Sequence, residues 1–122
     1  MRLHHVQVTS PPGGEDDARR FWMDGLCLTE IEKPEALRSR GGAWFRRDDV
    51  EVHIGIQDPF APARKGHPAL ELDDVATLET VADRLASLGF DVDWSERDTF
   101  PGYDRCYAFD AHGNRVELLA VG

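Results

Sequence analysis

The chain has 122 residues, of which 41% are hydrophobic and 30% are charged, so its composition is typical of a globular protein. Its 14 Lys and Arg against 23 Asp and Glu give a formal net charge of −9. Such an acidic chain argues against nucleic acid as a partner, because phosphate contacts require clustered Lys and Arg. No apolar run reaches the roughly 20 residues of a membrane span, so we expect no membrane partner either.

The first half of the chain predicts four strands and one helix. Residues 3–9 alternate apolar and polar side chains, as a half-buried strand does. Residues 15–26 have acidic residues in the first turn and apolar residues at three- and four-residue spacing, which indicates a helix. Residues 33–40 are interpreted as a loop. The remaining expected strands are 27–32, 43–47 and 50–57.

The second half repeats this order after a segment with two prolines. The helix expected at 75–88 has an apolar stripe, with Asp74 as its N-cap and Gly89 at its end. A hairpin turn is expected at 110–113, and His112 within it is predicted to be solvated. The expected strands are 67–72, 91–94, 103–109 and 114–120.

The repeated order predicts an α+β fold of two βαβββ modules. We place the first module at 1–57, a linker at 58–66 and the second module at 67–122, together forming one structural domain. Each module is expected to be a curled mixed sheet, and the two sheets should surround a central cleft.

Four candidate metal ligands occupy matched places in the two halves. His5 and His53 are 48 positions apart, and His67 and Glu117 are 50 positions apart. Each lies opposite the apolar face of its strand, because successive side chains of a strand point to opposite sides. The four side chains can therefore converge on one surface. Imidazole and carboxylate ligands suit one divalent ion, which could be Zn, Ni, Fe, Mn or Co.

Three stretches of the chain resemble a known family. They are LHHV at 3–6, GHPAL at 66–70 and DAHGNRVEL at 110–118. They are similar to the vicinal oxygen chelate superfamily, which includes glyoxalase I, bleomycin resistance proteins, fosfomycin resistance enzymes and extradiol dioxygenases. The resemblance covers nearly all of the chain and implies a glyoxalase-like fold that is usually dimeric.

The resemblance also implies roles for the four candidate ligands. In glyoxalase I the positions matching them bind the metal, although the second position is usually Glu and is His53 here. Extradiol dioxygenases and fosfomycin enzymes use two histidines and one glutamate, to which His5, His67 and Glu117 correspond.

Six other residues are candidates for contact with a ligand. In fosfomycin resistance enzymes the tyrosine matching Tyr107 touches the phosphonate, and Arg105 can hold an anion with two hydrogen bonds. The candidate substrate-binding residues are Tyr107, Arg105, Trp44, Arg46, Arg64 and Lys65. The cationic members favour, weakly, an anionic ligand.

Three functions remain open from the sequence. The favoured one is a metal-dependent enzyme acting on a small oxygen-rich substrate, either a lyase or isomerase with Glu117 as the catalytic base or a dioxygenase. The alternative is a bleomycin-resistance-like protein that binds a small molecule without catalysis. A structural or regulatory metal-binding module is the third.

We also expect a homodimer in the cytoplasm. Modules of about 60 residues bury little surface alone, which favours association. The linker at 58–66 is long enough that the cleft could form within one chain or between subunits. Two unpaired cysteines, Cys27 and Cys106, and an amino terminus unlike a signal peptide favour the cytoplasm.

Overall fold

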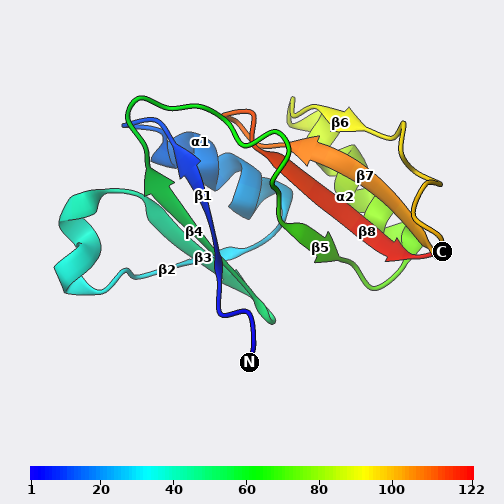
Figure 1. Cartoon of the computed structure of the whole chain (residues 1–122), viewed down its shortest axis with the longest axis horizontal. Helices are drawn as coiled ribbons and strands as arrows, with labels where there is room; N and C mark the ends of the chain where they lie inside the picture. Colours follow the sequence, from blue (N-terminus) through cyan, green and yellow to red (C-terminus); the bar gives the residue numbers. More distant parts are fainter.

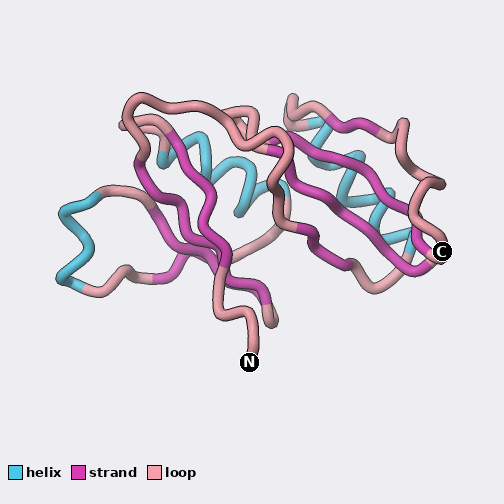
Figure 2. Tube along the Cα trace, viewed as in Figure 1, coloured by secondary structure: helices cyan, strands magenta, loops and turns pink.

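The computed structural model describes all 122 residues and contains two separate four-stranded sheets (Figures 1 and 2). The first half forms the first sheet, with the strand order β1–β4–β3–β2. Strand β1 runs parallel to β4, and the other pairs are antiparallel. Its elements are β1 (Val6–Ser10), α1 (Glu15–Arg19), η1 (Arg20–Gly25), β2 (Thr29–Ile31), η2 (Glu35–Arg40), β3 (Ala43–Arg47) and β4 (Val50–Ile56).

The second half repeats this topology. Its sheet has the order β5–β8–β7–β6, with β5 parallel to β8. Its elements are β5 (Ala69–Glu71), α2 (Val75–Ser87), β6 (Val92–Asp93), β7 (Tyr103–Phe109) and β8 (Arg115–Val121). The predicted α+β fold of two βαβββ modules is confirmed.

The helices begin where the sequence predicts. Asp74 caps α2, because its carboxylate accepts a hydrogen bond of 2.7 Å from the backbone N–H of Thr77. The helix expected at 15–26 continues from α1 into η1, a wider helical segment in which the N–H of Leu26 bonds to the carbonyl of Phe21.

Some predicted boundaries differ from the structure. Strands β1 and β5 begin later than expected, so His5 and His67 lie just before them rather than within them. The segment 33–40, interpreted as a loop, contains the short helix η2. Its turn pattern is local, and no apolar stripe marks it in the sequence.

The two modules share one hydrophobic core that lies between their helices and sheets. It contains 20 buried residues from both halves, including Phe21 and Trp22 of η1 and Leu78 and Leu85 of α2. The rings of Phe21 and Phe90 meet edge to face at 5.1 Å. The helices therefore pack against each other as well as against their sheets.

Hydrogen bonds also join the two halves. Arg84 donates from Nε to the carbonyl of Gly25 at 2.8 Å, and the amide nitrogen of buried Asn114 donates to the carbonyl of Thr9 at 2.8 Å. His112 was predicted to be solvated, and this is wrong. It is half-buried, and its Nε2 lies 3.0 Å from the carbonyl oxygen of Gly14, as a hydrogen-bond donor to it.

Each sheet has one face that no helix covers, which we call its open face (Figure 1). The molecule exposes 7237 Å² of surface. A compact monomer of 13.7 kDa would expose about 6,600 Å². The excess is consistent with two uncovered sheet faces. None of the helices combines the length and the hydrophobicity that a membrane span requires. Both cysteines are free.

The contact between the helices should depend on Gly25. A Cβ atom placed there would lie 2.4 Å from a methyl carbon of fully buried Leu85, so this side chain or the helix that carries it would have to shift. Gly25→Ala should therefore lower the free energy of unfolding by about 1–3 kcal/mol, measured by urea denaturation.

Gly66→Ala is the matched control for this substitution. No atom lies within 4 Å of a Cβ added at Gly66, so its stability should stay within about 0.5 kcal/mol of the wild type. Equal stabilities of the Gly25→Ala and Gly66→Ala variants would contradict the close helix contact.

Candidate functional site

The four candidate ligands lie on or beside the open faces as two pairs. The rings of His5 and His53 are stacked with their centroids 3.9 Å apart, beside the first sheet. On the second sheet, Nε2 of His67 lies 3.6 Å from a carboxylate oxygen of Glu117. Within one chain, no three His, Cys, Asp or Glu side chains come close enough together to hold a metal ion.

His53 is held on three sides. Trp44 lies opposite it across the β3–β4 pair, and their rings stack at 3.7 Å with an angle of 2°. Its Nε2 lies 2.7 Å from the carboxylate of Glu51 and donates a hydrogen bond to it. Only 4% of His53 is exposed, and this burial lowers the pKa of its imidazole below the usual value despite the carboxylate. The ring is therefore neutral at neutral pH.

Glu51 joins His53 to Arg46. Arg46 donates to one carboxylate oxygen of Glu51 from two nitrogens, at 2.6 and 3.0 Å. These hydrogen bonds, followed by the bond from His53, lower the pKa of Glu51 to about 2. Arg46 was a candidate for binding an anionic ligand, and the structure already pairs it with a carboxylate of its own chain.

His67 is oriented by its own backbone. Its Nδ1 donates to the carbonyl of Lys65 at 2.8 Å, so that in the neutral ring Nε2 is the unprotonated nitrogen, and it lies 3.6 Å from Glu117. This arrangement is typical of a metal-binding imidazole, whose second nitrogen is held by a backbone or carboxylate oxygen. Tyr107 packs edge-on against the ring, with the centroids 5.5 Å apart.

Glu117 is paired with Arg105 on the same open face. Glu117 is 5% exposed, and its carboxylate accepts a hydrogen bond of 2.9 Å from Arg105. Arg105 also donates to the hydroxyl of Thr99 at 2.7 Å and lies over the ring of Tyr107. Arg105 therefore neutralises the carboxylate to which the sequence assigns a metal.

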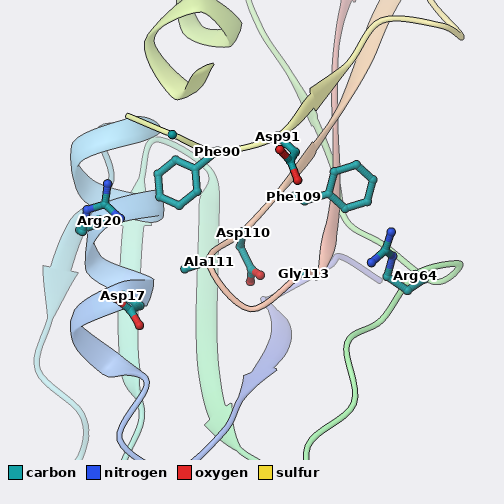
Figure 3. Close-up of a pocket in the computed structure, with 10 residues that line it drawn as sticks. Asp17, Arg20, Arg64, Phe90, Asp91, Phe109, Asp110, Ala111 and Gly113 are labelled. Atoms are coloured by element: carbon teal, nitrogen blue, oxygen red, sulfur yellow. The ribbon is translucent and has the colours of Figure 1, made fainter. Parts of the chain in front are cut away.

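Arg64 and Lys65 lie outside these two clusters. Arg64 stacks over Phe109, with its guanidinium carbon 4.9 Å from the ring centroid, and lines a separate cavity of about 500 Å³ beside η1 (Figure 3). The side chain of Lys65 is exposed and forms no ion pair. Of the six predicted ligand-binding residues, the structure brings Trp44 and Arg46 together on the first sheet, and Tyr107 and Arg105 on the second.

The two sheets meet at the strands β1 and β5. A pocket of about 340 Å³ there is lined by His5, Glu51 and His67 among others, but not by His53 or Glu117. One chain thus brings one residue of each candidate pair, His5 and His67, to the same pocket. The other two, His53 and Glu117, do not line it.

Sequence reasoning missed Glu51 and Arg115. Alternation along β4 places Glu51 on the face of His53, two residues away, and this was the signal that could have found it. The guanidinium carbon of Arg115 lies over Tyr107, 4.5 Å from the ring centroid, and its buried Nε has no hydrogen-bond partner.

Comparison with known proteins places the chain in a family. The model of the Glyoxalase/Bleomycin resistance protein/Dioxygenase superfamily matches residues 2–118. A crystal structure of a glyoxalase family protein from Bacillus anthracis is similar over 100% of this chain and 96% of that one, at 34% identity and a TM-score of 0.90. The chain therefore belongs to the glyoxalase/bleomycin resistance/dioxygenase superfamily.

More distant structures share the fold. The fosfomycin resistance protein FosX from Mesorhizobium loti is 20% identical, with a TM-score of 0.74, and the match covers 99% of this chain and 92% of that one. FosX from Listeria monocytogenes is 15% identical, with a TM-score of 0.75, over 100% and 92% of the two chains. No curated protein matches the chain.

Removal of Arg105 should destabilise the protein, because the carboxylate of Glu117 is then buried without a partner. Arg105→Gln leaves buried Glu117 without its charged donor, so the free energy of unfolding should fall by about 1–3 kcal/mol. Chemical denaturation of the metal-free protein would measure this loss. Arg115→Gln removes a charge from the same face without breaking an ion pair and should cost clearly less. Equal losses would show that the pairing with Glu117 contributes nothing specific.

Proposed function

We propose that this protein is a metal-dependent enzyme that acts on a small, oxygen-rich organic substrate. The observation that carries the proposal is the geometry of His67, whose Nδ1 is held by a backbone carbonyl while Nε2 is directed toward buried Glu117. An imidazole and a carboxylate prepared in this way are suited to a divalent ion. Membership of the superfamily supports the same reading.

The metal would be held by His5, His67 and Glu117, with His53 as the fourth and weakest candidate. The donor chemistry fits a divalent ion, because His5 keeps its Nε2 free while its Nδ1 contacts His4 at 3.0 Å. His53 is less suited, since its Nε2 is already used by Glu51. When bound, such an ion would polarise an oxygen of the substrate.

A second copy of the chain would complete the site. The open faces of both sheets carry the candidate residues, and no single chain gathers three ligands. Two chains related by a twofold axis would place the first sheet of one against the second sheet of the other. His5 would then join His67 and Glu117 of the partner chain, in two equivalent sites. A homodimer would also cover the excess exposed surface.

The chain's own residues would act on the substrate in distinct ways. Glu117 is the candidate base, because its carboxylate is buried and can accept a proton once Arg105 moves away. Arg105 would then be free to hold an anionic group of the substrate. Tyr107, between Arg105 and His67, would contact the same ligand.

The alternative is a protein that binds a small molecule without catalysis. One observation favours it: the carboxylates of Glu51 and Glu117 already have charged partners. Glu51 pairs with Arg46, and Glu117 pairs with Arg105. The faces are thus satisfied without a metal ion.

Metal analysis tests the proposal. Protein purified without an affinity tag and supplied in turn with Zn, Ni, Fe, Mn and Co should retain a stoichiometric ion with at least one of them. Glu117→Ala should abolish this binding, because it removes the charged ligand. Glu71→Ala, on an exposed glutamate of neighbouring β5, should bind as the wild type does.

Arg105→Gln should bind the ion more tightly than the wild type, because the metal no longer competes with the guanidinium for Glu117. Failure of every metal to bind, or metal binding by Glu117→Ala as tight as that of the wild type, would leave the alternative of ligand binding without catalysis.

A further inference from the structure

A hollow of about 270 Å³ lies on the first sheet, beside the cluster of Trp44, His53 and Glu51. Its lining comes from the strands β1, β3 and β4 and from the segment that joins β2 to β3. Figure 1 shows this segment, with its short helix η2, projecting from the first sheet. Its lining combines apolar, amide and cationic side chains. The residues are Gln7, Lys33, Leu37, Arg40, Gly41, Trp44, Ile54, Gly55 and Ile56.

Glycines make this hollow. Gly42, next to Gly41 of the lining, has a φ of +84°, which favours glycine. A Cβ at this position would lie 2.0 Å from the carbonyl oxygen of Ile54, so the loop can approach β4 this closely only without a side chain. At Gly55 a Cβ would lie 2.7 Å from the amide nitrogen of Gln7. The absence of a side chain at Gly55 lets Gln7 lie across β4 and line the hollow.

The hollow carries two cations that pair with no carboxylate. The chain has 23 acidic residues, and Arg46 and Arg105 are both neutralised by them. Arg40 forms no hydrogen bond or ion pair, and Lys33 donates only to the carbonyl of Gly41. Two cations without an ion-pair partner at one hollow favour an anion there over a cation.

The hollow lies beside the candidate site. Gln7 and Trp44 lie opposite His53 on its two neighbouring strands, and both also line the hollow. The side-chain amide of Gln7 has no hydrogen-bond partner in the chain and can bond to a ligand. A ligand in the hollow would therefore have Trp44 and Gln7 at the end near His53. Lys33 and Arg40 would contact its other end.

We propose that this hollow binds the carboxylate end of a small organic anion, with Arg40 and Lys33 holding the charge and Trp44 and Leu37 contacting its apolar part. That this anion is the substrate rests on the proposed function, because its other end would point to the candidate metal site. Binding of an anion to the hollow itself needs neither a metal nor a second copy of the chain.

Benzoate and its uncharged analogue benzamide are suitable probes, because they differ only in the charged end. Each is titrated into ¹⁵N-labelled full-length protein with a chelator present, and two-dimensional NMR spectra are recorded. Benzoate should shift the signals of the Trp44 indole N–H, the Gln7 side-chain amide and the backbone amides of Gly41 and Gly42. Benzamide should bind much more weakly at the same place.

Arg40→Gln is the decisive variant, and Arg38→Gln is its matched control. Arg38 lies on the same short helix but is held by the carbonyl of Lys33 and by Glu32, and it does not line the hollow. Arg40→Gln should weaken benzoate binding about tenfold, the loss of one charge-assisted hydrogen bond, while Arg38→Gln leaves it nearly unchanged. Unshifted signals elsewhere in the spectrum would establish that both variants fold normally.

The inference is overturned if benzoate shifts none of these signals, if benzamide binds equally well, or if the two variants weaken binding equally. Glu117→Ala separates it from the proposed function. This variant should lose the metal but bind benzoate as the wild type does, because Glu117 does not line the hollow. A wild type that binds benzoate through Arg40 but no metal would retain the anion site and refute the metal-dependent enzyme.

Discussion

The packing of the two helical segments against each other determines the rest of the structure. η1 and α2 meet where Gly25 leaves room for Leu85, and Arg84 reaches back to the carbonyl of Gly25. Because the apolar side chains of both sheets point to these helices, one core serves both modules. The opposite face of each sheet is therefore left to side chains that the core does not need, and the candidate functional residues occur there.

The polar side chains of the open faces are paired with one another. His53 lies between the rings of Trp44 and His5 and bonds to Glu51, and Glu117 bonds to Arg105. Burial of a carboxylate is costly unless a charged donor compensates it, so each arginine stabilises the metal-free state. A metal ion at Glu117 would compete with Arg105 for the charge of this carboxylate.

Much of the fold could be predicted because its signals are local. The alternation along β4 and β8 assigns His53 and Glu117 to the uncovered faces, and the apolar period of α2 with its Asp74 cap defines that helix. The partners of these residues were not predictable in the same way. Which carboxylate neutralises Arg105, or that His112 reaches Gly14 in the other module, depends on distances between segments far apart in the chain. Arg40 ends the short helix η2, which no apolar period marks in the sequence.

The central claim is that two chains together form each metal site, and co-expression of two defective chains tests it most directly. A His5→Ala chain and a Glu117→Ala chain, carrying different tags without histidine, are purified as a heterodimer, and bound metal is measured. In a twofold dimer each site takes His5 from one chain and Glu117 from the other, so one site of the heterodimer carries both substitutions and the other site carries neither. The account predicts about one ion per heterodimer, and none in either mutant homodimer. A heterodimer that binds no metal, while the wild type does, would contradict it and place each site within a single chain.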